Sequence, residues 1–229
     1  MKNLISRSGI TKFMNSKDFA KKVNAVITRW SKDTSKLVVA IDGYTGVGKT
    51  TLLNNLAKVN PNILPVNRDD FQIPRSKFTK LYKNATDENV KDRSHIFELE
   101  SNDSVKLNKL VEAFRTSNKS YKIKVYDGVS GRVSIPKTFD LSKKIMVIEG
   151  VFMFHPKLLN KILDKRIYLQ GNIKQIDERR IVREKKRWGK NYFPETHQDS
   201  YFRQVIVAFR RYQKLYKPEK VADLVLDID

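Results

Sequence analysis

The chain contains no cysteine and only three histidines among its 229 residues. The absence of cysteine excludes disulfide bonds, thiolate zinc sites and a cysteine nucleophile. The histidines, His95, His155 and His197, are scattered, which does not fit the spacing of a histidine-rich metal site. Because nothing suggests a disulfide framework, we expect a cytoplasmic protein.

Long hydrophobic runs are also missing. No stretch approaches the roughly 18 apolar residues that a membrane span needs. The first residues, MKNLISRSGITKF, lack the uninterrupted apolar segment of a signal peptide. We therefore expect neither secretion nor contact with a membrane.

Acidic residues are scarce relative to basic ones. There are 25 Asp and Glu against 46 Lys and Arg, which gives a formal net charge of +21. Such an excess attracts partners that carry phosphate, whether nucleotide, nucleic acid or anionic membrane, without selecting among them. Much of the charge is lysine spread along the whole chain, which fits a bias in composition at least as well as a dedicated binding patch.

The hydrophobic pattern predicts one α/β domain over residues 1–229, with a helical extension at 1–35. Hydrophobic residues make up 40% of the chain, and no linker rich in Pro, Gly or Ser divides it. Helices are expected at 17–30, from the loop at 43–50 to about 58, and at 103–117, 156–163, 174–188 and 199–215; strands are expected at 37–41, 63–66, 121–126, 144–149, 166–169 and 222–227. This alternation predicts a mainly parallel sheet flanked by helices.

Residues 43–50, GYTGVGKT, match the pattern GxxxxGK[ST] in full. Glycines allow the backbone to turn tightly around an anion, and the following helix presents free N–H groups at its positive end. In this pattern Lys49 reaches the β- and γ-phosphates, and the Thr50 hydroxyl binds Mg²⁺. A strand pattern before the match and a helix pattern after it indicate a phosphate-loop (P-loop) NTPase fold. The residues expected to bind ATP are Gly43, Thr45, Gly46, Val47, Gly48, Lys49, Thr50 and Thr51.

Acidic residues follow two of the strand patterns, and so fall at the sheet edge where ligands bind. Asp69 and Asp70 come after the second strand pattern. A carboxylate there can accept a proton from a hydroxyl or hold magnesium through water, and the alternative role is to cap a turn. Glu149 ends an apolar strand, which predicts an acid that faces the metal. Asp42, just before the loop, is expected only to cap its turn.

Several motifs, taken in order, resemble the uridine kinase/phosphoribulokinase family of P-loop kinases. They are GYTGVGKTT at 43–51, DDF at 69–71, YDGVSGR at 126–132, IEGVF at 148–152, ERRIVREKKRWG at 178–189 and ADLVLD at 222–227. The first motif is common to P-loop proteins, whereas the ordered set, over about 36–229, is considerably more specific. The resemblance implies a kinase that transfers the γ-phosphoryl group of ATP, with Mg²⁺, to a hydroxyl group of a small nucleoside-like molecule.

The resemblance also implies roles for individual residues. Asp69 matches the base that acts on the acceptor hydroxyl, and Glu149 matches the glutamate associated with magnesium. Tyr126 and Arg132 match positions at the acceptor site. Phe71 falls in the segment that is expected to line that site.

A basic helix at 174–188 and the polar residues up to about 196 form an expected lid. Arg179, Arg183 and Arg187 are spaced four residues apart, so they share one helix face that suits the capture of phosphate. The resemblance implies that these residues and Arg180 close over the transferred group. Arg179 and Arg183 are the expected catalytic pair, and Arg183 also reaches the acceptor. A solvated basic face is the alternative.

Two departures from uridine kinases leave the acceptor undefined. Those enzymes usually carry an aromatic residue where this chain has Gln72, and a histidine where this chain has only GVSG before Arg132. A sugar or a vitamin precursor therefore stays open beside a nucleoside. Nucleic acid is the rival acceptor because of the charge, although no known nucleic-acid-binding module is present. A regulatory ATP-binding protein would not need the acids and the arginine helix together.

Overall fold

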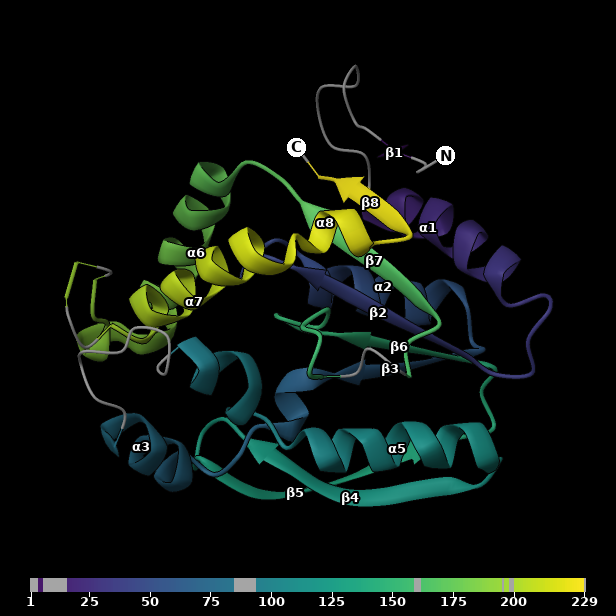
Figure 1. The fold of residues 1–229 in the computed structure, drawn as a ribbon, viewed down its shortest axis with the longest axis horizontal. Helices are drawn as coiled ribbons and strands as arrows, with labels where there is room; N and C mark the ends of the chain where they lie inside the picture. The colour runs from purple at the N-terminus through teal and green to yellow at the C-terminus, as the bar shows by residue number, and fades with distance from the viewer. Residues whose placement is uncertain are drawn as a thin grey trace.

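The computed structural model describes residues 4–5, 16–84, 94–158, 162–194, 196–197 and 200–228. A parallel sheet runs through its centre in the strand order β1-β8-β7-β2-β6-β3 (Figure 1). The strands are β1 (Leu4–Ile5), β2 (Leu37–Gly43), β3 (Ile63–Asn67), β6 (Ile145–Glu149), β7 (Lys165–Gln170) and β8 (Leu224–Asp227). Each neighbouring pair is parallel, so the predicted α/β fold with a mainly parallel sheet is confirmed.

The inner strands β2 and β6 are covered on both faces. All seven residues of β2 and all five of β6 are buried, as expected for the near-continuous apolar runs LVVAIDG and IMVIE. The strand β3 lies at the edge of the sheet. Pro65 is tolerated there, because an edge strand has one side on which a missing ladder N–H costs little.

Helices lie in front of the sheet and behind it, and also at the end where its strands finish (Figure 1). They are α1 (Ser16–Trp30), α2 (Lys49–Val59), α3 (Arg75–Asn84), α5 (Ser104–Thr116), α6 (Ile173–Trp188), α7 (Tyr201–Tyr216) and α8 (Pro218–Val221). The helix α1 packs on α2, and its residues Phe19, Val23 and Ile27 are buried in the core. This part of the predicted N-terminal extension is therefore integral to the fold. Across the described residues, no helix is long and apolar enough to cross a membrane.

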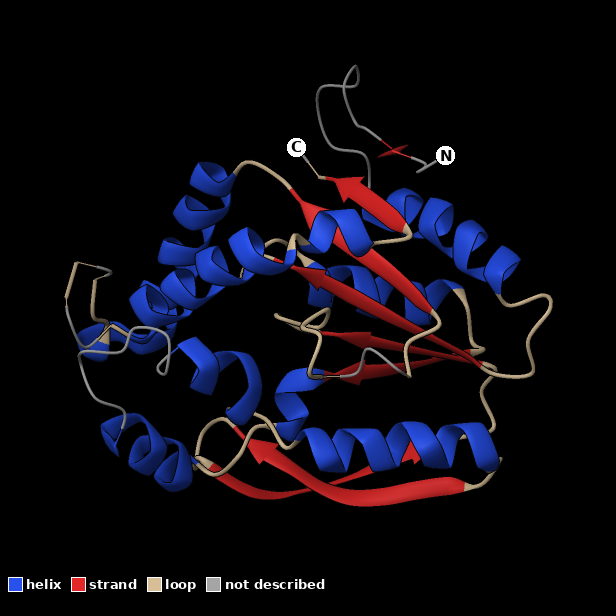
Figure 2. Ribbon diagram, viewed as in Figure 1, coloured by secondary structure: helices blue, strands red, loops and turns tan. Residues whose placement is uncertain are grey.

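The strand predicted at 121–126 is present but belongs to a different sheet. It forms β4 (Ser120–Asp127) and pairs antiparallel with β5 (Arg132–Asp140), apart from the parallel sheet. The pattern for β5 is weak, because RVSIPKTFD contains a proline and only Phe139 is fully buried. Figure 2 shows the two strands beside α5, outside the main sheet. We call this pair the β4–β5 ribbon.

Among the described residues of the short helix predicted at 156–163, none is helical. Residues 156–158 form a turn that is closed by isolated backbone hydrogen bonds, such as Leu158 N to His155 O at 2.9 Å, and residues 159–161 lie outside the described residues. The elements that the patterns did not predict are β1, α3, β5 and α8, and the short η1 (Arg68–Phe71), the π-helix η2 (Ile96–Glu100) and η3 (Gly189–Asn191). The turn η1 follows β3 at the carboxyl end of the sheet, and η2 packs on both α3 and α7.

The register of the sheet brings three strand ends to the same level. Ile41 of β2 pairs with Glu149 of β6, and Glu149 pairs with Asn67 of β3. The arrowheads of these strands point to the side where α3, α6 and α7 lie (Figure 2). The loop after β2, the end of β6 and the turn η1 after β3 therefore meet at one edge of the sheet.

Candidate functional site

The loop between β2 and α2 is shaped by its three glycines. Gly46 and Gly48 have φ angles of +83° and +104°, a region that residues with a side chain rarely adopt. A Cβ atom on Gly43 would lie 2.4 Å from the carbonyl oxygen of Leu169, so β7 leaves no room for another residue. No side chain caps the start of α2 at Lys49, and its first N–H groups can therefore bind an anion.

Three other residues predicted to bind ATP lie on this loop or on the first turn of α2. Thr45 is half-buried and Thr51 is exposed on the first turn of α2. The Val47 side chain is buried, so this residue can offer only its backbone to a ligand. Val47 N donates to Tyr44 O at 3.2 Å, which helps to close the loop.

Lys49 is buried inside this loop, with 6% of its surface exposed. Its Nζ donates to the carbonyl oxygens of Gly43 at 2.9 Å and Tyr44 at 3.0 Å. Burial lowers the pKa of Lys49, and nearby carboxylates, among them Glu149 and Asp69, act in the opposite direction. The ammonium group therefore lies between the loop and the acids that follow β6 and β3, where a phosphate would meet both.

Thr50 and Glu149 come together as predicted. Thr50 Oγ1 donates to Glu149 Oε1 at 2.8 Å, and Glu149 is buried. Burial raises the pKa of Glu149, while the charge of Lys49 and the Thr50 hydrogen bond lower it. A hydroxyl and a carboxylate are hard oxygen donors of the kind that Mg²⁺ prefers. The pair therefore fits a magnesium ion that also binds phosphate and water. Across the described residues there is no cluster of three or more His, Cys, Asp or Glu able to bind a metal.

The two aspartates of η1 differ in their partners. Asp70 forms an ion pair of 2.6 Å with Lys137 of β5. Asp69 is exposed, and its carboxylate has no hydrogen bond or ion pair with any described residue. Its backbone N–H donates to Asn67 Oδ1 at 2.8 Å, which holds the turn, and its charge acts on both Lys49 and Glu149. Asp69 is therefore the available carboxylate at this edge.

Of the three residues predicted at the acceptor site, Phe71 needs correction. Phe71 is 2% exposed and stacks on Phe139, with ring centroids 6.3 Å apart. It anchors η1 on the β4–β5 ribbon and is not available to a ligand. The pairing register of the ribbon places Tyr126 and Arg132 one position out of phase, and so on opposite faces. The roles of Tyr126 and Arg132 at the acceptor site stay predictions.

The predicted lid helix is α6, and Arg180 is the arginine that packs on the loop. Its side chain is 1% exposed, and its Nη2 lies 3.2 Å from Asp177 Oδ1. A Cβ atom on Gly46 would lie 3.5 Å from Arg180 Cβ. Asp177 Oδ1 also accepts a hydrogen bond from Tyr44 Oη at 2.9 Å. The start of α6 is thus tied to the P-loop, with Arg180 over its central glycine.

The other arginines of α6 are turned more towards solvent. Arg179 and Arg187 are exposed, and the Arg183 side chain is 58% exposed, although its charge acts on Lys49. A Cβ atom on Gly128 would lie 3.8 Å from Arg187 Nη2, so the end of α6 lies beside the turn of the β4–β5 ribbon. The helix therefore extends from the P-loop towards the turn that precedes Arg132.

Asp42 does more than cap the turn as expected. Its Oδ1 accepts from Gly43 N at 2.6 Å, and its Oδ2 accepts from Tyr212 Oη at 2.6 Å and from Phe154 N at 3.2 Å. Burial raises the pKa of Asp42, and the Tyr212 hydrogen bond lowers it. An acid within an apolar strand pattern was the one signal in the sequence for this network. Its consequence is a buried link between the end of β2 and α7.

Three features together define a P-loop protein that binds nucleotides. They are the glycine-rich loop after β2, the acid that ends the neighbouring strand β6, and the basic helix α6 that packs on the loop. The model of the phosphoribulokinase/uridine kinase family matches residues 38–226, and the chain belongs to this family. The resemblance found in the ordered motifs is thereby confirmed.

Individual relatives are distant. Over 156 residues the chain is 27% identical to a uridine kinase from Ureaplasma parvum, across 66% of this chain and 70% of that protein. Over 146 residues it is 25% identical to nicotinamide riboside kinase 1 from Homo sapiens, and this match spans 64% of each chain. A solved structure described as a possible uridine kinase from Bacillus stearothermophilus has a TM-score of 0.65 at 22% identity, across 92% of this chain and 98% of that one. The likeness to this structure shows the shared fold.

Proposed function

We propose that the protein is a kinase that transfers the γ-phosphoryl group of ATP to a hydroxyl group of a small nucleoside-like molecule. The observation that carries this proposal is the convergence of Lys49, the Thr50–Glu149 pair and Asp69 at one edge of the sheet. Phosphoryl transfer needs a cation for the phosphates, oxygen ligands for magnesium and a group that orients the nucleophile. Membership of the phosphoribulokinase/uridine kinase family supports the same activity.

Each of these residues has a distinct part in the proposed reaction. Lys49 and the first N–H groups of α2 bind the β- and γ-phosphates, and Thr50 and Glu149 hold Mg²⁺, which when bound neutralises charge on the transferring group. Asp69 orients the acceptor hydroxyl and takes its proton. Arg180 and Arg183 supply guanidinium groups from α6, and closure of this helix over the nucleotide would exclude water and limit wasteful hydrolysis of ATP.

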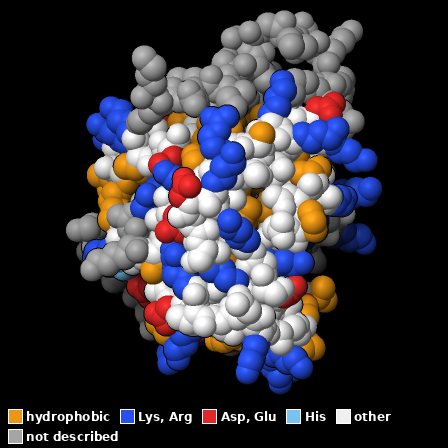
Figure 3. Space-filling model, turned by 90° about the vertical axis from the view of Figure 1, so that its right-hand side faces the viewer, with side chains coloured by type: hydrophobic (Ala, Val, Ile, Leu, Met, Phe, Trp, Pro, Cys, Tyr) orange, Lys and Arg blue, Asp and Glu red, His pale blue; other side chains and the backbone are white. Residues whose placement is uncertain are grey.

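A nucleoside-like acceptor is the choice that the relatives favour, since two of them are named for kinases of uridine and of nicotinamide riboside. Gln72, which replaces the usual aromatic residue, forms a backbone bridge with Asn102 at the edge of this site. The proposal therefore names the class of acceptor and not uridine itself. On the face shown in Figure 3, Lys and Arg side chains are spread over the surface among hydrophobic and uncharged ones.

The test is ATP consumption with Mg²⁺ against uridine, cytidine, nicotinamide riboside, simple sugars, pantothenate-like alcohols and short oligonucleotides with a free 5′-hydroxyl. We expect turnover with at least one nucleoside. Turnover with a sugar or a vitamin precursor alone would keep the kinase and replace the acceptor class. Turnover with oligonucleotides alone would overturn the proposal of a small acceptor.

Asp69→Asn should lower the rate of transfer by at least about 100-fold, because positioned general bases contribute roughly 10²–10⁴-fold. Asp70→Asn is the matched control, because Asp70 is held by Lys137. That variant should bind ATP normally and keep its rate to within a few-fold. If Asp69→Asn turns over at close to the wild-type rate, Asp69 is not the base.

A further inference from the structure

A second group of charged side chains lies buried outside the site just described. Glu98 of η2 is 0% exposed, and both of its carboxylate oxygens accept from Arg211 Nη1, at 2.7 and 2.8 Å. His155, also buried, places its Nε2 3.3 Å from Glu98 Oε2. Removing a carboxylate from water is costly unless its partners compensate. None of these three side chains has a part in the proposed transfer, so the cluster needs another explanation.

The backbone of Glu98 connects this cluster to the turn that carries Asp69. Arg68, the residue before Asp69, donates from Nη2 to the carbonyl oxygen of Glu98 at 2.9 Å and from Nη1 to that of Val151. The carbonyl oxygen of Arg68 itself accepts from Asn102 Nδ2 at 2.9 Å. Both the side chain and the backbone of Arg68 are therefore held, and η1 begins from a fixed point.

Gly150 makes this packing feasible. A Cβ atom at position 150 would lie 2.7 Å from Arg68 Cβ and 2.9 Å from Arg68 Cδ, distances that real Cβ contacts do not show. Only glycine lets the arginine pass directly against the chain after Glu149. Arg68 thus packs against the chain directly after Glu149, and it directly precedes Asp69.

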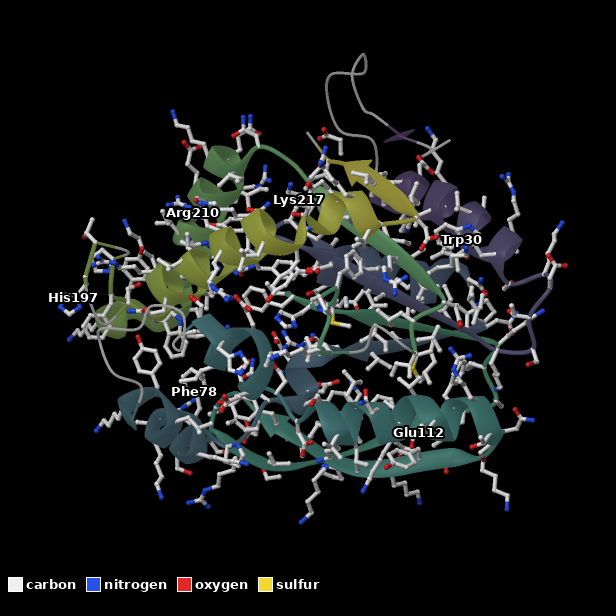
Figure 4. All side chains as sticks on the ribbon, in the orientation of Figure 1. Trp30, Phe78, Glu112, His197, Arg210 and Lys217 are labelled. Atoms are coloured by element: carbon white, nitrogen blue, oxygen red, sulfur yellow. The ribbon has the colours of Figure 1, made fainter. Side chains whose placement is uncertain are left out.

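The aromatic side chains of α3 also pack on η2, the element that carries Glu98. Phe78, which is labelled in Figure 4, lies edge-on to Phe97 with ring centroids 5.4 Å apart. Tyr82 lies in a similar arrangement, 6.0 Å from Phe97. These contacts hold one side of η2, while the carboxylate of Glu98 is held from the other direction by α7.

We propose that Glu98 is a positioning residue for Asp69. Its charge, paired with Arg211, fixes η2, and its carbonyl oxygen then fixes Arg68 and the turn that follows. This inference rests on the proposed function, in which Asp69 acts on the acceptor. It assigns the buried pair to the acceptor half of the site, so its loss should slow transfer and leave ATP binding at the P-loop unchanged.

The variant Glu98→Gln removes the charge and keeps the shape of the side chain. We expect kcat to fall about ten- to hundredfold, since a misplacement of about 1 Å can cost that much, with the Kd for ATP within about twofold of wild type. Arg211→Met should reproduce this result and Arg211→Lys should restore part of the rate. Asp164→Asn is the control, because it removes a partly exposed ion pair of 2.9 Å with Arg115 and should change neither quantity. Wild-type kcat in Glu98→Gln, or equal losses of kcat and ATP affinity, would overturn the proposal.

A double-mutant cycle separates positioning from a general loss of stability. If Glu98 acts through Asp69, adding Glu98→Gln to Asp69→Asn should lower the residual rate no further. A merely structural role would make the two losses multiply. Multiplied losses would therefore contradict the assignment of Glu98 to Asp69.

Amide hydrogen exchange tests the same contacts without turnover. In Glu98→Gln, residues 67–73 should exchange faster, while residues 43–59 should keep their protection. Unchanged exchange at 67–73 would overturn the positioning role whatever the kinetics. If the wild-type protein transfers phosphate to no acceptor, the proposed function fails, and this exchange measurement still decides whether Glu98 holds the turn.

Discussion

Replacing Tyr212 with phenylalanine should destabilise the protein by about 2–3 kcal/mol at pH values where Asp42 is ionised, since hydrogen bonds to charged groups contribute roughly 1.5–3 kcal/mol. The Tyr212 hydroxyl donates to Asp42 Oδ2 at 2.6 Å and accepts from Phe154 N at 3.1 Å. The ring contacts with Phe152 and Phe209 are kept in the variant. For a chain of this length each kcal/mol shifts the midpoint of thermal unfolding by roughly 2–4 °C. The midpoint should therefore fall by about 4–12 °C.

The stability lost in Tyr212→Phe should depend on pH, because the hydroxyl group of Tyr212 donates to the carboxyl group of Asp42. Burial raises the pKa of Asp42. A carboxyl group with a raised pKa in the folded state contributes stability below its unfolded pKa, and this contribution is lost as the pH rises through the folded pKa. Removal of the Tyr212 hydroxyl withdraws support from the ionised form and raises the pKa further. The difference in midpoint between wild type and variant is thus largest well above the folded pKa and narrows as the pH falls.

Circular dichroism during heating, at several pH values from 8 down to 5, measures this difference. Tyr168→Phe is the control, because Tyr168 is also buried but its hydroxyl accepts from the neutral side chain of Gln213 at 3.1 Å. That variant should lose about 1 kcal/mol, the usual contribution of a neutral hydrogen bond, without the same dependence on pH. Two results would refute the reasoning. One is a loss of stability in Tyr212→Phe that is no greater than the loss in Tyr168→Phe, and the other is a difference in midpoint between wild type and Tyr212→Phe that grows as the pH falls.

Two further substitutions test the phosphate loop. Lys49→Ala should reduce phosphoryl transfer by at least about 100-fold while the protein still folds, which circular dichroism measures. A variant that fails to fold would show that Lys49 and its contacts with Gly43 and Tyr44 hold the fold together. Gly46→Ala should weaken ATP binding about tenfold, because a side chain at a left-handed φ costs roughly 1–2 kcal/mol and its Cβ would lie 3.4 Å from Ile176. Calorimetric titration with ATP and Mg²⁺ measures this, and an unchanged Kd would contradict it.

Most strands of the parallel sheet, and the helices that cover it, were predictable because their own sequences carry the pattern of their burial. The strand β1 was not predicted, since its two residues are too few to show a pattern. The runs of β2 and β6 are apolar throughout, and both strands are buried on both faces. The β4–β5 ribbon and η2 were not predictable from their own sequences, because both are held by contacts with residues far away in the chain. Asp69 and Asp70 look alike in the sequence, and only Lys137, 67 residues after Asp70, separates the available carboxylate from the paired one.

The helix α6, which is the predicted lid, also has an orientation that its own sequence does not determine. Basic residues occupy so much of α6 that their spacing does not say which face is turned inward. The contact that decides this is the hydrogen bond from Tyr44 to Asp177, which joins the loop to the helix. It places Arg180 over Gly46, whereas the predicted face carries Arg179 and Arg183. Periodicity describes an element, and a hydrogen bond between two elements sets their relative rotation.

Helix α7 joins the two halves of the proposed site through polar contacts that no pattern could predict. Arg211 binds Glu98 on the acceptor side, and the next residue, Tyr212, binds Asp42 at the base of the P-loop. Buried polar groups without partners are costly, so both contacts together allow the helix to dock in one register only. In-line phosphoryl transfer needs donor and acceptor at a fixed separation. A single rigid helix attached to both sides is a direct way to maintain that separation while α6 closes over the nucleotide.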